Sequence, residues 1–353
     1  MPKRKTDLVH LQPNLSPIEL AQDLEQLRER QLRQVELSAA KATRDAYDLD
    51  MRQFEAWCSE RGARARPCAP EVLGLYLAHL ERLGRAPSTI SRKLAGIVRH
   101  HVAQGHESPR TALISEQMKG IRRGEDGARR GAVKKAPPMT TQELLLIVRA
   151  MDAAPAAWSA LVARDKAALL IGWACAMRRS EIAALEIDDA ERTREGWKIW
   201  IRRSKTDQAG EGIALALAPA ERLPAICPVA ALEAWLTERR AGAERAPAGA
   251  LFWKSCEQEE HRTVPPRLLT GEPMPWQQLN RLVKRWSRRA GLATGAVPFS
   301  PHSLRAGFIT EAISTGKSIA LTKERSRHVS MDVFFGYVRI AQTFENNAQK
   351  GLM

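Results

Sequence analysis

The sequence lacks the features that mark membrane-spanning and metal-binding proteins. No apolar run approaches the ~20 residues that a transmembrane helix needs. The basic N-terminus, residues 1–5, is not followed by the apolar core of a signal peptide. The five cysteines are odd in number, widely spaced and without CxxC spacing, and no Cys/His or Asp/Glu cluster has metal-ligand spacing. We therefore expect a cytoplasmic protein with reduced thiols and no metal or other cofactor.

Acidic residues are also scarce relative to basic ones. The 353 residues include 55 lysines and arginines against 40 aspartates and glutamates, a formal net charge of +15. Such a balance favours a polyanionic partner, with nucleic acid as the first candidate and an anionic membrane surface as the second. A solubility charge or a ribosome-associated role would produce the same balance, so charge alone places DNA only modestly ahead.

The chain is longer than most chains that fold around a single hydrophobic core, so two domains are expected. Residues 1–35 are polar and read as an N-terminal extension with a helical stretch near 18–32. Residues 36–124 have helical periodicity throughout, which predicts a compact domain of four or five helices. Residues 125–139 combine basic residues, glycines and a proline pair, and we interpret them as a basic linker. A second domain occupies residues 140–353.

The second domain is predicted to be mostly α-helical with a small antiparallel sheet. Segments 197–202 and 212–217 are strand-like and flank a turn that contains Lys205, which predicts a hairpin. An apolar helical run surrounds residues 176–181. Further helices are expected at 228–240, 275–290 and 303–314 and again from Val333.

One ordered set of polar residues in this domain suggests phosphodiester chemistry. The set is Arg178, Lys205, His302, Arg305, His328 and Tyr337. Guanidinium groups are forked donors for a phosphate, a tyrosine can act as nucleophile, and histidine and lysine can move protons. Because two arginines can balance the charge of a phosphate, no metal is required.

Each of these residues also has an ordinary structural explanation. A helical arginine usually forms a surface ion pair, a turn lysine is usually solvated, and a tyrosine usually belongs to a core. Arg178 gains weight because it interrupts an apolar run, where an unpaired charge is costly. Glu181 lies three residues further on the same helical face and can orient Arg178 or a neighbouring histidine. His302 and Arg305, also three apart, share a face at a helix start.

These motifs resemble the tyrosine recombinase (phage integrase) family. Residues 176–182, Ala-Met-Arg-Arg-Ser-Glu-Ile, are similar to the family's Gly-Leu-Arg-x-Ser-Glu-Leu, which makes Arg178 and not Arg179 the matching arginine. Residues 302–305 are similar to its HxxR motif. Where the family often has Leu-Gly-His, this chain has Ser-Arg-His, so Arg327 stands in place of a glycine.

The resemblance covers nearly the whole chain and is nearest to Cre-like recombinases. It implies a C-shaped two-domain DNA clamp with an N-terminal core-binding domain and a C-terminal catalytic domain. Tyr337 would form a covalent 3′-phosphotyrosine, and Lys205 would protonate the leaving 5′-oxygen. His302 would accept the tyrosine proton or donate to the phosphate, and His328 would donate to a non-bridging oxygen. The implied catalytic set is Arg178, Glu181, Lys205, His302, Arg305, His328 and Tyr337.

The resemblance also implies an assembly on DNA. Four protomers, monomeric or dimeric when free, would synapse two duplexes with inverted-repeat sites and exchange strands through a Holliday junction without ATP. Residues 343–353 would form a helix that docks on the next protomer, although the helix could also fold back on its own domain. The bacterial protein would associate with the nucleoid when bound.

Other candidate DNA contacts lie in the first domain, in the linker and on the predicted helix at 275–290. That helix has an apolar face and a basic face, which is also the pattern of a solvated surface helix. Its first polar residues could read bases while its arginines bind phosphates. The candidates are Arg44, Thr89, Ser91, Arg92, Lys93, Arg122, Arg123, Gln277, Gln278, Arg281, Lys284 and Arg285.

Two other readings stay open. A type IB topoisomerase or a telomere resolvase shares the catalytic set, although the helical first domain and the C-terminal tail favour a recombinase. A non-catalytic DNA-binding regulator is of a different class, and an aligned nucleophile is not needed for binding alone.

Overall fold

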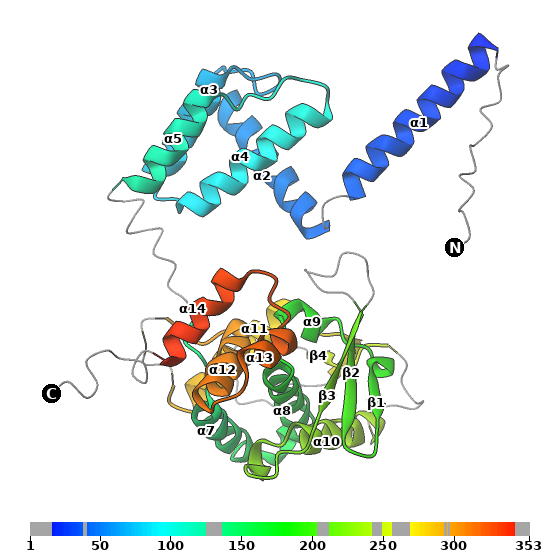
Figure 1. Cartoon of the computed structure of the whole chain (residues 1–353), viewed down its shortest axis with the longest axis vertical. Helices are drawn as coiled ribbons and strands as arrows, with labels where there is room; N and C mark the ends of the chain where they lie inside the picture. The colour runs from blue at the N-terminus through cyan, green and yellow to red at the C-terminus, as the bar shows by residue number, and fades with distance from the viewer. Residues whose placement is uncertain are drawn as a thin grey trace, which may run out of the picture. The chain divides into compact units, whose positions relative to one another are not determined.

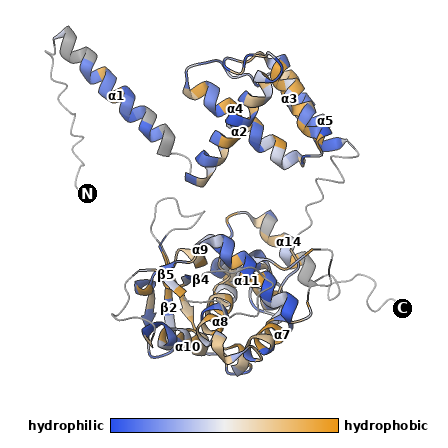
Figure 2. Ribbon diagram, turned by 180° about the vertical axis from the view of Figure 1, so that it is seen from behind, coloured by the Kyte–Doolittle hydropathy of each residue, from blue (hydrophilic) through white to orange (hydrophobic). Residues whose placement is uncertain are grey.

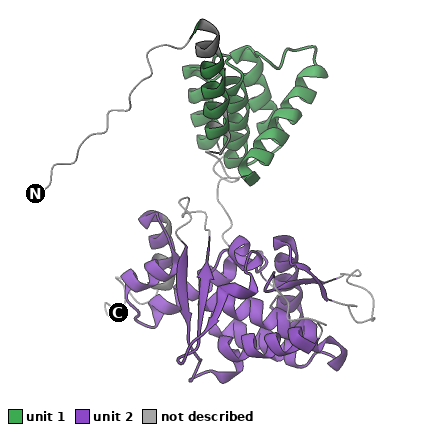
Figure 3. Ribbon diagram, turned by 90° about the vertical axis from the view of Figure 1, so that its right-hand side faces the viewer, with its two compact units in different colours: residues 1–133 green, residues 134–353 purple. Residues whose placement is uncertain are grey.

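The computed structural model describes residues 16–37, 41–124, 136–202, 212–241, 249–255, 269–292, 295 and 297–342. The chain divides into two compact units, residues 1–133 and 134–353, each with its own apolar core (Figure 3). Both units are largely helical and the second contains small antiparallel sheets, which confirms the predicted fold class. Lys205, residues 125–135 of the predicted linker and residues 343–353 lie outside the described residues.

The described helices of the first unit are α1 (Pro17–Leu37), α2 (Lys41–Ser59), α3 (Pro70–Arg82), α4 (Pro87–Ala103) and α5 (Ala112–Arg123). Prolines open α3 and α4, since the first turn of a helix leaves its N–H groups unpaired in any case. Phe54, Tyr76 and Ile97 are among the buried residues through which α2, α3 and α4 share a core. Residues 22–31 of α1 are exposed, and Figure 2 shows this helix as mainly hydrophilic.

The second unit is built around α8, whose residues 167–172 are all buried. In Figure 1 its neighbours α7, α10 and α12 lie around it, as their contacts require. The helices of the unit are α7 (Thr141–Asp152), α8 (Ser159–Ala174), α9 (Arg179–Ala183), α10 (Pro228–Ala241), α11 (Trp276–Arg289), α12 (Pro301–Ser314), α13 (Ile319–Ser326) and α14 (Met331–Gln342). Short 3₁₀ turns are η1 (Ala156–Trp158), η2 (Ile187–Asp189) and η3 (Pro224–Ile226).

The predicted hairpin is confirmed. Strands β2 (Trp197–Ile201) and β3 (Ile213–Leu217) pair antiparallel, with Trp197 opposite Leu217, and β1 (Ala190–Arg192) pairs with the other edge of β2. Buried and exposed residues alternate along both strands, as expected for a sheet with one face on the core. A second, unforeseen sheet pairs β4 (Trp253–Ser255) with β5 (Leu269–Pro273).

The apolar run around Arg178 is not one continuous helix, so the prediction that this arginine lies within a helix is wrong. Helix α8 ends at Ala174, and Ala176 then adopts a left-handed φ of 46°. Arg178 has extended backbone geometry and is the N-cap of α9. The turn therefore brings Arg178 to a helix start, where its side chain can leave the core.

A close backbone approach fixes α12 against the segment before α7. The Met139 N–H donates to the Ser303 carbonyl over 2.9 Å, and the Trp173 Nε1–H donates to the Met139 carbonyl over 2.8 Å. A Cβ on Gly307 would lie 1.7 Å from the Met139 carbonyl oxygen. Only glycine therefore permits this crossing, which lies one turn from Arg305.

No single helix in the described ranges is both long and apolar enough to cross a bilayer. Residues 141–152 and 156–174 meet the length and composition criteria only as a pair bent by 116°. The second member of this pair includes the buried centre of the second unit's core.

Candidate active site

Four segments of the second unit bring the predicted catalytic side chains together. Arg178 comes from the turn between α8 and α9, and His302 and Arg305 come from the first turns of α12. His328 follows the end of α13, and Tyr337 lies on α14. Packing of α12 against α13 and α14 sets the distances among them.

His302 and Tyr337 form the shortest contact in the group. His302 Nε2 lies 2.6 Å from the Tyr337 hydroxyl oxygen. Burial raises the pKa of Tyr337, and the Arg305 cation opposes this shift. Desolvation and the cations Arg305 and Arg178 lower the pKa of His302, although part of its surface stays exposed. A neutral His302 can therefore accept the proton of the phenol near pH 7.

His328 is held in one tautomer. Its Nδ1 lies 3.2 Å from Arg305 Nη2 and 2.9 Å from Ser326 Oγ. A guanidinium can only donate, so Nδ1 must accept and the ring proton must sit on Nε2. Burial and the nearby cations, Arg305 first among them, lower the pKa of His328 to about 3. The ring is therefore neutral with an Nε2–H free to serve as a phosphate donor.

Arg305 is buried and anchored to the turn that carries Arg178. Its Nη1–H donates to the Ala176 carbonyl over 2.7 Å. Burial and the cations Arg178 and Arg327 lower the pKa of Arg305 to about 9, so the guanidinium remains charged at neutral pH. A buried cation with donors left over is a suitable ligand for an anionic oxygen.

The predicted pairing of Arg178 with Glu181 is present, but it forms across a helix start. The Arg178 Nη1–H donates to Glu181 Oε1 over 2.7 Å, and the Arg178 backbone N–H donates to Oε2 over 2.8 Å. Burial alone would raise the pKa of Glu181, but Arg327 and Arg178 outweigh it and hold this pKa below its usual value. Glu181 therefore stays a carboxylate and orients Arg178.

The arrangement joins a tyrosine, a base in contact with it and several donors for a phosphate. Such donors stabilise the negative charge that develops on the non-bridging oxygens during transfer. Among the residues that the structure describes, no group of three or more His, Cys, Asp or Glu side chains could hold a metal ion.

Residues 138–343 match the phage integrase family. The chain belongs to this family of tyrosine recombinases. It is 29% identical over 320 residues to an integrase/recombinase XerD homologue of Selenomonas ruminantium, covering 90% of this chain and 86% of the relative. The solved Tn1549 transposon integrase, in complex with circular intermediate DNA, has a similar fold, with a TM-score of 0.54, 16% identity and 88% and 94% coverage of the two chains. A lambda integrase tetramer bound to a Holliday junction gives a TM-score of 0.53, 15% identity and 89% and 76% coverage.

Arg327 was not among the site residues predicted from the sequence of this integrase-family chain. It was noted only as a replacement for glycine, yet its Nη2–H donates to Glu181 Oε2 over 2.7 Å. The available signal was a charged residue at a position that favours glycine, directly after a helical turn with basic residues.

Two of the candidate DNA contacts must be withdrawn. Lys93 is buried, and its Nζ donates to Asp50 over 3.0 Å and also to Gln53. Gln278 is buried, and its amide bonds Ser255, including the backbone carbonyl over 2.8 Å. These side chains hold their own units together and cannot reach a base without unfolding their surroundings.

The other candidates divide by exposure. Arg285 is half-buried and donates to Asp165 over 2.7 Å. Arg92 is exposed and pairs with Asp50 over 2.5 Å. A phosphate bound to either arginine would have to compete with its carboxylate partner. The half-buried members are Arg44, Thr89, Ser91 and Lys284. The exposed members are Arg122, Arg123, Gln277 and Arg281.

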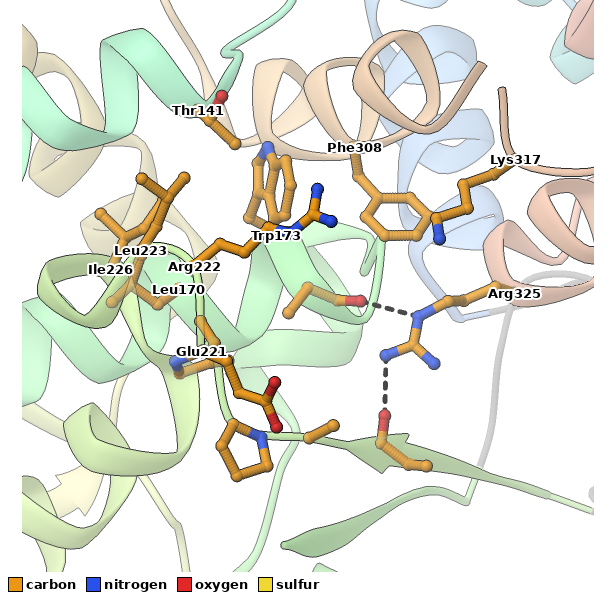
Figure 4. A pocket seen from close by; sticks show the side chains of 16 residues that line it. Thr141, Leu170, Trp173, Glu221, Arg222, Leu223, Ile226, Phe308, Lys317 and Arg325 are labelled. Atoms are coloured by element: carbon orange, nitrogen blue, oxygen red, sulfur yellow. Dashed lines mark hydrogen bonds between the residues drawn. The ribbon is translucent and has the colours of Figure 1, made fainter. Parts of the chain in front are cut away.

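A separate apolar cavity of about 770 Å³ is lined by residues of α7, α8, α12 and α13, among others (Figure 4). Trp173 and Phe308 line it, and Arg325 crosses its edge to donate to the carbonyls of Ala174 and Ala216 over 2.8 and 2.7 Å. None of the six predicted catalytic residues that the structure describes lines the cavity. The chemistry of the site therefore belongs to the polar group and not to this cavity.

Proposed function

We propose that this chain is a site-specific DNA recombinase that cuts and rejoins strands through a covalent 3′-phosphotyrosine. The observation that carries the proposal is the 2.6 Å contact between His302 and the Tyr337 hydroxyl, beside the guanidinium groups of Arg178 and Arg305. Binding alone would not need a base in contact with an aligned nucleophile.

The chemistry follows from these positions. His302 takes the phenolic proton as the Tyr337 oxygen attacks the scissile phosphorus, and the bond from phosphorus to the 5′-oxygen breaks. Lys205, outside the described residues, protonates that leaving oxygen. The phosphotyrosine retains a phosphodiester-like bond, so rejoining by a 5′-hydroxyl needs neither ATP nor a metal ion.

The phosphate is held from three directions. Arg178 and Arg305 balance the charge on its non-bridging oxygens, and His328 donates through Nε2. Glu181 pairs with Arg178 and keeps it oriented. The hydrogen bonds among these groups hold them in position, which lowers the cost of reorganisation during the reaction.

The proposed assembly is a Cre-like tetramer on two inverted-repeat sites that passes through a Holliday junction. The proposal is supported by the solved lambda integrase, which has a similar fold and is a tetramer bound to a Holliday junction. In this chain, residues 36–124 and 140–353 would grip DNA together across the basic linker at 125–139. Residues 343–353 would dock on the neighbouring protomer.

A nicked suicide substrate tests the proposal, because loss of the short fragment beyond the nick traps the covalent adduct. The substrate would contain the inverted repeat found in the DNA beside the gene. We expect a protease-sensitive DNA adduct from the wild type and none from Tyr337→Phe with equal DNA binding. Tyr76→Phe is the matched control, since Tyr76 is a buried core tyrosine of the first unit.

The same experiment separates the alternatives. An adduct that does not depend on a second paired site would indicate a topoisomerase or a telomere resolvase. Tight binding without any adduct would indicate a non-catalytic regulator and would refute the proposed chemistry.

A further inference from the structure

Arg327 occupies a backbone conformation that favours glycine. It ends α13 with a left-handed φ of 55°, at the position where the resembled motif has glycine. A side chain makes this conformation unfavourable because the Cβ crowds the following carbonyl. Ala176, which also stands in the place of a motif glycine, has a left-handed φ of 46°. The chain thus keeps two glycine-like turns without their glycines.

The Arg327 side chain joins these two turns. It is only 7% exposed, and its Nη2–H donates to Glu181 Oε2 over 2.7 Å and to the Ala176 carbonyl over 3.3 Å. Its Nη1–H donates to the Cys175 carbonyl over 3.1 Å. In return the Arg327 carbonyl accepts a hydrogen bond from Arg178 Nη2 over 3.2 Å. A single residue therefore contacts both ends of the turn that carries Arg178.

The position of the Arg327 side chain is unfavourable for folding in two respects. Arg327 Nε is buried and has no hydrogen-bond partner among the described residues. Arg327 also adds a third cation beside Arg178 and Arg305, and their mutual repulsion contributes to the lowered pKa of Arg305. Burying an unpaired donor and a like charge is unfavourable. Retention of the side chain is explained if it serves the reaction.

We propose that Arg327 is a positioning residue whose side chain acts as a latch between the two turns. Its guanidinium fixes Glu181 and the carbonyl of Ala176, and these two groups in turn hold Arg178 and Arg305. Arg327 thereby presets both phosphate-binding arginines before DNA arrives. The inference rests on the proposed strand-transfer function and adds a residue that the resembled motif does not contain.

The test variant is Arg327→Gly, which suits the left-handed backbone and removes only the latch. We expect its single-turnover cleavage rate on the nicked substrate to fall by roughly 10–100-fold, the range for residues that orient a site from behind. DNA affinity should not change, since the side chain is buried. Arg327→Lys keeps one charge near Glu181 and should recover part of the rate.

Arg325→Ala is the matched control. Arg325 lies two residues earlier and also donates to backbone carbonyls, those of Ala174 and Ala216, without a contact to Glu181 (Figure 4). Its loss removes two side-chain hydrogen bonds to the scaffold. The cleavage rate of this variant should stay close to that of the wild type.

A neutral substrate separates positioning from general structural damage. A methylphosphonate at the scissile position replaces one charged oxygen by a methyl group and reduces the need for aligned arginines. The defect of Arg327→Gly should shrink on this substrate if the latch acts through Arg178 and Arg305. An equal defect on both substrates, or a wild-type rate on the ordinary phosphate, would overturn the inference. If the wild type itself forms no adduct, the proposed function fails and the inference fails with it.

Discussion

Gly307→Ala should destabilise the catalytic unit even though alanine is the better helix former. An added Cβ would lie 1.7 Å from the Met139 carbonyl oxygen and 2.4 Å from its carbon. Both atoms are backbone, and they are fixed because Met139 bonds Ser303 and Trp173. The crossing segment must therefore move by more than 1 Å, roughly the shortfall from an ordinary ~3.4 Å contact.

The magnitude follows from two opposing contributions. Replacing a helical glycine by alanine stabilises a helix by about 1 kcal/mol. Overpacking against an immovable neighbour costs about 1–3 kcal/mol and sometimes more. Because the neighbour here is hydrogen-bonded backbone, we expect a net loss of about 1–2 kcal/mol. The same substitution at Gly120, a helical glycine of α5 with no atom within 4 Å of the added Cβ, should instead stabilise its unit by about 1 kcal/mol.

Urea unfolding of the full chain, followed by hydrogen exchange in α12 and in α5, measures the two effects separately. Displacement of α12 should also slow cleavage, since His302 and Arg305 lie on it. Equal or greater protection of α12 in Gly307→Ala than in the wild type would refute the close-approach argument.

Three further outcomes are expected. Arg178→Ala should slow strand cleavage by about 10²–10³-fold with intact DNA binding in a filter assay, because one preorganised donor set is lost. The rate of cleavage should fall by about tenfold per pH unit below the pKa of His302, which is lowered from its usual value, because only the neutral imidazole accepts the tyrosine proton. A cleavage rate that rises at acid pH would contradict this assignment. As pH falls below about 6.5, the free energy of unfolding should decrease. The reason is that His328 becomes protonated in the unfolded chain but stays neutral in the folded protein, where its pKa is about 3. In thermal melts, His328→Gln should reduce this dependence of stability on pH.

Periodic patterns predicted most of the fold. The helices of both units and the β2–β3 hairpin follow from apolar spacing and turn residues, because local sequence determines them. The sheet of β4 and β5 was missed because β4 has three residues and its pairing has a register shift. The break after α8 was missed because Ala176, not glycine, adopts the left-handed conformation, so no turn signal marks it.

The catalytic group was easier to predict than the DNA contacts. Motif spacing indicated His302, Arg305 and Tyr337, and the structure brings them together. Lys93 and Gln278 are turned inward by hydrogen bonds to Asp50 and Ser255, which are 43 and 23 residues away in sequence. Such partners are set by tertiary packing, which helical periodicity does not encode.

The latch around Glu181 leaves the free active site with an excess of positive charge. Arg178, Arg305 and Arg327 carry three positive charges, and among the described residues Glu181 is the carboxylate that pairs with two of them, Arg178 and Arg327. A bound phosphodiester would then balance the remaining positive charge of these arginines as well as being the reactant. By linkage, the catalytic unit should tolerate more heat in the presence of anions that enter the site. Glu181 limits this repulsion in the absence of DNA, and the protein is therefore built to be most stable when occupied.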